Sequence, residues 1–132
     1  MGTVGYLLDT HTFLWAAYDE AKLTVTAREA IQGQKSNVFI SAVSAFEVMN
    51  KHRLGKLPEY KYVVDNYFDI LTEFGAIELP VSTRHAHYAG EFDWYHRDPF
   101  DRLLAAQAYI DNLTLITNDS DIKSLPWISV LW

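Results

Sequence analysis

Short apolar runs alternate with helical segments along the whole chain of 132 residues, and this alternation limits the fold more than any other feature. The runs predict strands at 5–8, 37–40, 76–79, 113–117 and 127–131. The segments between them predict helices at 10–17, 24–31, 41–54, 60–74, 82–91 and 99–111. Strands that alternate with helices are typical of an α/β fold with a mostly parallel sheet. We expect a single domain over residues 1–132.

The charge balance and the absence of cysteine exclude several classes of function. Eleven basic and 17 acidic residues give a net charge of −6, which disfavours nucleic-acid binding unless a metal cation contacts the phosphates. A chain without cysteine has no disulfide, thiolate metal site or cysteine nucleophile, and it fits a reducing cytoplasm. No apolar run reaches the ~18 residues of a membrane span and no secretory signal is present, so we expect a cytoplasmic protein.

Four acidic residues occupy positions that a parallel sheet brings together. Asp9 follows the first strand directly, and Asp119 follows the fourth after one residue. Glu47 lies about two turns into the helix after the second strand, and Asp101 lies in the first turn of the helix that leads to the fourth. Ligand sites in such sheets lie outside the carboxyl ends of the strands. We therefore expect these carboxylates to converge at one sheet edge.

A cluster of unpaired carboxylates is stable only when a cation neutralises it, because like charges raise one another's pKa. Hard oxygen ligands favour Mg²⁺, with Mn²⁺ as an alternative. A metal held in this way polarises a phosphoryl oxygen and lowers the pKa of bound water, which is the chemistry of phosphodiester hydrolysis.

Each acid also has a purely structural interpretation. Asp9 is a candidate N-cap, Ser44 and Glu47 have the spacing of a capping box, and Asp119 is placed to close an Asx turn. Asp98, before Pro99, is explained by capping alone. These interpretations do not account for the expected convergence of the other acids.

Four segments in order resemble the PIN domain, specifically the VapC toxins of bacterial toxin–antitoxin pairs. They are Leu7-Leu8-Asp9-Thr10-His11, Ile40-Ser41-Ala42-Val43-Ser44-Ala45-Phe46-Glu47, Asp98-Pro99-Phe100-Asp101-Arg102-Leu103-Leu104-Ala105-Ala106-Gln107-Ala108 and Leu115-Ile116-Thr117-Asn118-Asp119. The resemblance extends from residue 6 to residue 132 and implies a three-layer α/β/α domain.

The resemblance also implies a Mg²⁺-dependent endoribonuclease whose catalytic and metal-binding acids are Asp9, Glu47, Asp101 and Asp119. The first, third and fourth hold the metal that activates water, and Glu47 orients a second metal or a metal-bound water. The products are then a 5′-phosphate and a 3′-hydroxyl. The family further implies a homodimer and a small antitoxin whose C-terminal segment enters the active-site groove.

Further residues are candidates for substrate contacts. Beside the last acid, Thr117 or Asn118 is placed to support substrate or metal-bound water. His11 either contacts a phosphate or packs at a helix start, and Arg102 either reaches RNA or pairs with Asp98.

Basic and aromatic groups elsewhere have two interpretations each. The basic groups line a groove for the RNA backbone or form solvated ends: Lys51, His52, Arg53, Lys56, His96 and Arg97. The aromatic groups stack on bases or pack in a core or dimer interface: Trp15, Trp94, Tyr95 and Trp132.

Two other functions compete with the nuclease. A catalytically silent PIN-like module would bind RNA or protein without cleavage, but the full set of acids argues against it. A phosphate-handling signalling domain or phosphatase needs a second acid after the first strand, where this chain has Thr10 and His11. The sequence also contains no glycine-rich phosphate loop.

Overall fold

Five parallel strands form the central sheet in the spatial order β3-β2-β1-β4-β5. The computed structural model describes residues 4–132. Its strands are β1 (Val4–Leu8), β2 (Ser36–Ser41), β3 (Ile77–Leu79), β4 (Thr114–Ile116) and β5 (Ser129–Leu131). The predicted α/β class is confirmed, and the sheet is parallel throughout. The strand order reverses direction between β1 and β4, which is where open α/β sheets place their ligand sites.

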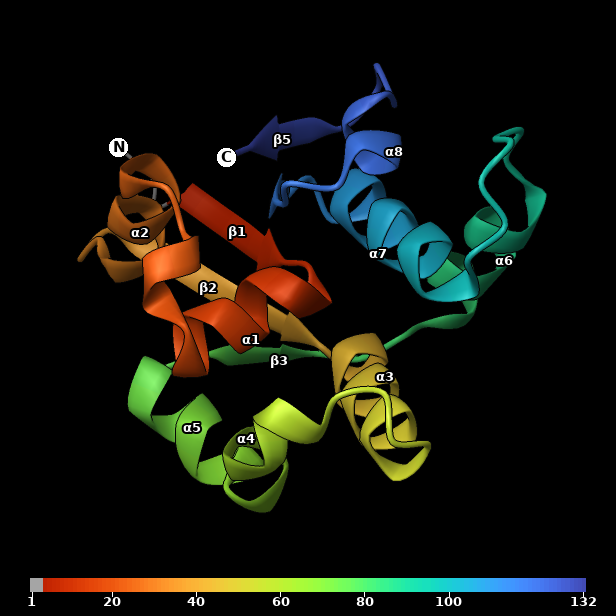
Figure 1. The fold of residues 1–132 in the computed structure, drawn as a ribbon. Helices are drawn as coiled ribbons and strands as arrows, with labels where there is room; N and C mark the ends of the chain where they lie inside the picture. The colour runs from red at the N-terminus through yellow and green to blue at the C-terminus, as the bar shows by residue number, and fades with distance from the viewer. Residues whose placement is uncertain (1–3) are drawn as a thin grey trace.

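Helices pack on both faces of the sheet (Figure 1). They are α1 (Thr10–Tyr18), α2 (Val25–Gln32), α3 (Ala42–Arg53), α4 (Lys61–Asp65), α5 (Tyr67–Phe74), α6 (Thr83–Glu91), α7 (Pro99–Ile110) and α8 (Ser120–Lys123), with 3-10 turns at Glu20–Lys22 and Pro58–Tyr60. Within residues 4–132, no helix has both the length and the apolar character that crossing a membrane requires.

Two apolar cores separate the three layers. Leu8, with side chains of β2 and β4, packs against α1, α2, α3, α4 and α5. Leu7 faces the other way and packs against α7 and α8. Both leucines are fully buried, as the apolar first strand predicted for a sheet covered on both faces.

The prediction of a single helix over residues 60–74 is wrong. The structure has α4 and α5 there, separated by Asn66, whose backbone leaves the helical region at φ −122° and ψ 24°. The backbone N–H and the side-chain amide of Asn66 both donate to the Tyr62 carbonyl, at 3.1 and 2.9 Å, and Asn66 is the C-cap of α4. Gly75 ends α5 at φ +61°, as predicted.

Buried polar contacts fix the helix that carries Asp101. Gln107 of α7 is fully buried, accepts a hydrogen bond from the Ser41 hydroxyl at 2.6 Å and donates to the Pro80 carbonyl at 3.2 Å. These bonds join α7 to the carboxyl ends of β2 and β3. They therefore set the position of the first turn of α7 relative to the sheet edge.

Candidate metal centre

A cleft of about 250 Å³ lies at the carboxyl ends of the strands and contains all four predicted acids. Its lining residues are Asp9, Thr10, His11, Trp15, Glu47, Lys51, Asp98, Asp101, Asn118 and Asp119. Five of these side chains are acidic and one is a lysine. The structure therefore brings the predicted acids together, and it adds Asp98 to them.

Asp9 is held rigidly at the base of the cleft. One carboxylate oxygen accepts from the Thr12 backbone N–H at 2.7 Å and caps α1, and the other accepts from the Thr117 hydroxyl. Burial raises the pKa of Asp9 above its usual 3.8, although the hydrogen bonds from Thr117 and Thr12 oppose this shift. The N-cap interpretation of Asp9 is correct, and it is compatible with a place in the cleft.

Thr117 connects two of the acids. Its buried hydroxyl donates to Asp9 and accepts from the backbone N–H of Asp119 at 3.0 Å. The Asp119 carboxylate in turn caps α8 by accepting from the Ile122 N–H at 3.0 Å. The turn predicted here is thus the start of a short helix, which the sequence analysis did not predict.

Glu47 is buried and forms an ion pair with Lys51. Its carboxylate lies 2.5 Å from the Lys51 ammonium, one helical turn further along α3. The capping-box interpretation of Ser44 and Glu47 is wrong, because Ser41 caps α3. Ser44 instead shares a hydrogen bond of 3.0 Å with the Thr10 hydroxyl, which links α3 to α1 beside Asp9.

Asp101 is partly buried near other charged groups of the cleft, and its pKa is raised. Burial, and then the charges of Asp98 and Asp119, raise its pKa to about 6, although a hydrogen bond from His96 opposes the shift. The Nε2 atom of His96 lies 2.7 Å from the Asp101 carboxylate. Burial lowers the pKa of His96, but the hydrogen bond and charge of Asp101, with the charges of Asp121 and Asp119, raise it more, so the net shift is upward.

The donor set suits a hard divalent cation. Five carboxylates face one small cleft, and burial, followed by the charges of Asp98 and Asp119, raises the pKa of Asp101. Oxygen ligands of this kind favour Mg²⁺ or Mn²⁺. Asp98 caps α7 with one oxygen, as expected, and also lines the cleft.

The predicted substrate-contact residues divide into two groups. His11, Lys51 and Asn118 line the cleft, and the stem of Lys51 places its ammonium 5.8 Å from the centre of the Phe100 ring. Arg53 lies outside the cleft lining, at the exposed end of α3, where it donates to Asn50 at 2.6 Å.

The Arg102 side chain is engaged in hydrogen bonds to the backbone of the protein. Its guanidinium donates to four backbone carbonyls between α6 and α7, at distances of 2.5–3.1 Å, and lies 4.4 Å from the centre of the Phe92 ring. The four carbonyls belong to Ala89, Phe92, Trp94 and His96. Neither predicted partner of Arg102, RNA phosphate or Asp98, accounts for these bonds, so its main role is to hold residues 89–96 against α7.

We expect Arg102→Lys to lower the free energy of unfolding by about 2–3 kcal/mol, because a lysine cannot serve four carbonyls at once. Urea denaturation measures this change, and Arg84→Lys on the exposed face of α6 is the matched control. An unchanged stability combined with lost RNA binding would return Arg102 to the substrate-contact group.

His96 lies 2.7 Å from Asp101, and Asp121 lies 3.6 Å from His96. The sequence predicts His96 only in a basic groove or a solvated end, and it gives no role to Asp121. Residues 92–98 have no helix or strand, so no periodicity indicates which way these side chains point. The short spacing from His96 to Asp101 was the only available signal.

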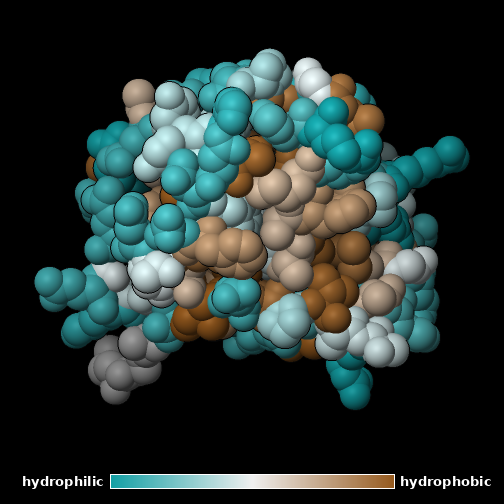
Figure 2. Space-filling view, turned by 90° about the horizontal axis from the view of Figure 1, so that it is seen from below, coloured by the Kyte–Doolittle hydropathy of each residue, from teal (hydrophilic) through white to brown (hydrophobic). Residues whose placement is uncertain are grey.

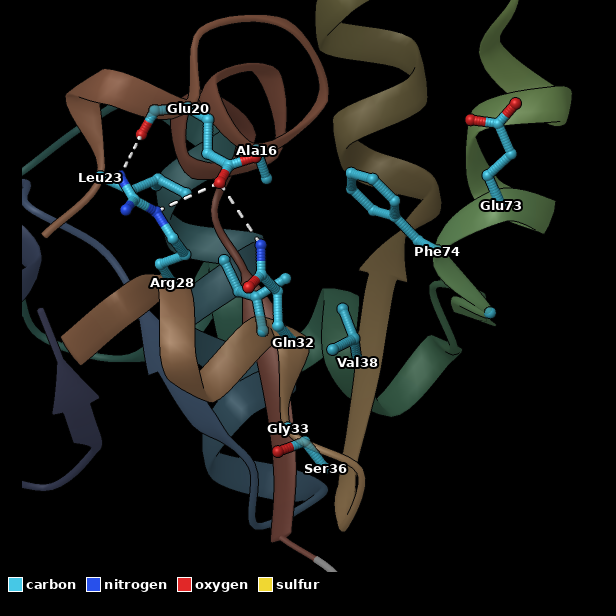
Figure 3. Close-up of a pocket in the computed structure, with 12 residues that line it drawn as sticks. Ala16, Glu20, Leu23, Arg28, Gln32, Gly33, Ser36, Val38, Glu73 and Phe74 are labelled. Carbon is cyan, nitrogen blue, oxygen red and sulfur yellow. Dashed lines mark hydrogen bonds and ion pairs between the residues drawn. The ribbon is translucent and has the colours of Figure 1, made fainter. Parts of the chain in front are cut away.

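A second cavity, of about 400 Å³, lies away from the acids between α1, α2 and α5 (Figure 3). Its Arg28 and Gln32 side chains both contact Glu20, at 3.2 and 3.4 Å. The cavity borders Ser36, at the amino end of β2, and so lies opposite the edge that carries the acids.

Comparison with known structures identifies the same fold in complexes. VapBC2 from Rickettsia felis bound to a DNA fragment from their promoter has a TM-score of 0.65 and 18% identity, covering 98% of this chain and 99% of that chain. A toxin–antitoxin complex from Klebsiella pneumoniae has a TM-score of 0.58 and 19% identity, with 96% of each chain covered. The PIN domain endonuclease Utp24 has a TM-score of 0.56 and 16% identity, covering 96% of this chain and 83% of that chain.

At sequence identities of 16–19%, the similarity to these structures establishes the fold and no more. Comparison with curated proteins found no match. The family model described as PIN domain matches residues 6–128, which include all four predicted acids. The chain therefore belongs to the PIN domain family.

Proposed function

We propose that this chain is a Mg²⁺-dependent endoribonuclease, the toxin of a toxin–antitoxin pair, acting in the cytoplasm. The observation that carries the proposal is the convergence of Asp9, Glu47, Asp101 and Asp119 on one cleft. The PIN domain match and the toxin–antitoxin neighbours support a VapC-like nuclease. The substrate and the metal are the parts that experiment must establish.

The residues divide the work of hydrolysis between them. Asp9, Asp101 and Asp119 would hold the cation, which would polarise a phosphoryl oxygen and lower the pKa of bound water. Thr117 fixes two of these ligands relative to each other. Glu47, whose carboxylate lies 2.5 Å from the Lys51 ammonium, orients a second metal or a metal-bound water.

Substrate contacts come from the same cleft. Lys51 is the lysine among the lining residues and faces an otherwise acidic wall, so it is suited to contact a phosphate. His11, Asn118 and the ring of Trp15 provide further polar and stacking contacts. Arg53 extends positive charge along α3 beyond the cleft.

Incubation of the purified protein with cellular RNA tests the function. We expect discrete fragments with 5′-phosphate and 3′-hydroxyl ends in Mg²⁺ and none in EDTA, because a metal-activated water is the nucleophile. Cleavage that persists in EDTA would contradict the mechanism. Binding of RNA without cleavage, after denaturation and refolding to remove any inhibitor, would favour the silent binding module.

Protein partners form part of the proposal. The antitoxin partner is supported by the toxin–antitoxin neighbours. The homodimer is supported by an apolar face over α3, α4 and α5, which Figure 2 shows from below. Phe68 is 73% exposed and lines two grooves here together with Ala45 and Tyr67.

We expect Phe68→Asp to halve the molar mass of the protein measured by light scattering, because a buried carboxylate would oppose the dimer. Val25→Asp, at another exposed apolar side chain (65%), is the control. A dimeric Phe68→Asp variant would place the interface elsewhere.

A further inference from the structure

We propose that His96 is a metal ligand, and that His96, Asp98 and Asp101 form a mixed imidazole–carboxylate site for a transition-metal ion such as Mn²⁺ at the rim of the acidic cleft. This inference deepens the proposed function, because Asp101 belongs both to the rim and to the four-acid set.

The three side chains already have the spacing of ligands around one ion. Their donor atoms all lie within 4.8 Å of one another, and the His96 Nε2 atom is 2.7 Å from an Asp101 oxygen. Ligands of one octahedral ion lie about 3 Å apart when adjacent and about 4.2 Å apart when opposite. Small side-chain movements are therefore enough to admit an ion between them.

The contacts behind His96 point to a ligand in their own right. Its second ring nitrogen, Nδ1, lies 3.6 Å from a carboxylate oxygen of Asp121, and the Tyr95 hydroxyl donates to the other oxygen of that carboxylate. A carboxylate behind the imidazole is the usual arrangement that orients a metal-binding histidine.

The backbone around His96 is fixed by the same helix that carries Asp101. Arg102, the next residue of α7, donates to the His96 carbonyl at 3.0 Å and to three other carbonyls of the preceding segment. The Trp94 ring packs 4.9 Å from the imidazole. His96 is thereby preorganised beside Asp101 even though its segment has no regular secondary structure.

Asp98 completes the set. Its Oδ1 atom caps α7 by accepting from the Phe100 N–H at 2.9 Å, and within residues 4–132 no hydrogen bond engages Oδ2. That oxygen is available to a metal. Both Asp98 and Asp101 line the cleft, so the rim site opens toward the other acids.

An imidazole nitrogen changes which metal the cleft prefers. Carboxylate and water ligands suit Mg²⁺ and Mn²⁺ alike, whereas imidazole strengthens binding to transition-metal ions. The chain should therefore bind Mn²⁺ more tightly than Mg²⁺, and this preference should depend on His96.

The test is pulsed electron paramagnetic resonance of the full chain loaded with Mn²⁺ alone, in protein with natural and with ¹⁵N-imidazole histidine. We expect nitrogen coupling that changes with the isotope and disappears in His96→Gln. In titration calorimetry, the same variant should raise the dissociation constant of Mn²⁺ at least ~10-fold and that of Mg²⁺ by a smaller factor.

Two controls identify the nitrogen. His11→Gln removes the imidazole that lines the cleft, and His87→Gln removes an exposed imidazole of α6; both should keep the coupling. Absence of histidine coupling in the wild type, its persistence in His96→Gln, or its loss in His11→Gln would overturn the proposal. The wild-type measurement decides even if His96→Gln folds poorly.

The measurement also separates this inference from the proposed function, because it uses no RNA. A protein with His96-dependent coupling that cleaves no RNA would retain the metal site and lose the nuclease. A protein that cleaves RNA without histidine coupling would retain the nuclease and lose this site.

Discussion

Asp9→Asn is expected to reduce RNA cleavage by about 100- to 1,000-fold, the range seen when a group that stabilises transition-state charge is removed. The substitution keeps the shape of the side chain. Its amide oxygen can still accept from the Thr12 N–H and cap α1. It loses the negative charge that the cation needs, so kcat/KM should fall while the fold is preserved.

Steady-state cleavage at saturating Mg²⁺ measures this effect, with circular dichroism to verify folding. Asp93→Asn, at an exposed aspartate outside the cleft lining, is the matched control and should cleave like the wild type. Full activity in Asp9→Asn would remove Asp9 from the mechanism.

Asp101→Asn is expected to stabilise the metal-free protein at pH 7 by about 1–3 kcal/mol while impairing cleavage. Burial raises the pKa of Asp101 from 3.8 to about 6, so the fold favours the protonated carboxyl and is destabilised when it ionises. Each pKa unit corresponds to about 1.4 kcal/mol. An asparagine removes the ionisation.

The stability of the metal-free protein should depend on pH in a definite direction. Because the folded-state pKa of Asp101 lies above its ordinary value, wild-type stability in EDTA should rise as pH falls from 7 toward 4. The raised pKa of His96 acts in the same direction as pH falls through the neutral range. Thermal unfolding in EDTA at pH 7 and pH 5 should show a smaller pH effect in the variant.

Mg²⁺ should reverse the order of the two proteins, because a ligand that binds only the folded state stabilises it. We propose that the ionised Asp101 carboxylate destabilises the metal-free fold and that Mg²⁺ offsets this cost. Both parts would be contradicted if the wild type were as stable as Asp101→Asn in EDTA and gained no stability from Mg²⁺.

The alternation of apolar runs predicted the fold because strands and helices of an α/β sheet have distinct periods. It failed where the local backbone departs from that periodicity. At Asn66 the backbone leaves the helical region and divides the helix predicted over 60–74, and no hydrophobic pattern records that conformation.

Convergence of the acids was predictable for the same reason that the sheet was. Parallel strands end at one edge, so residues after β1 and β4 meet there, and α3 and α7 begin at that edge. The position of His96 depends on four carbonyl contacts of Arg102, which only the folded backbone reveals.

Structural and functional interpretations of the acids proved compatible. Asp9, Asp98 and Asp119 each cap a helix and line the cleft. A capping aspartate at a sheet edge is held in one rotamer by its backbone partner, which makes it a preorganised ligand. A sequence pattern that predicts helix capping therefore gives no reason to exclude an aspartate from the candidate metal site.

The most direct test of the central claim, a divalent cation held by these acids, is anomalous diffraction from crystals of the protein soaked in Mn²⁺. We expect an anomalous peak within coordination distance of Asp9 and Asp101, and this peak should disappear in Asp9→Asn crystals. A cleft without a peak, or ions bound only outside it, would contradict the claim.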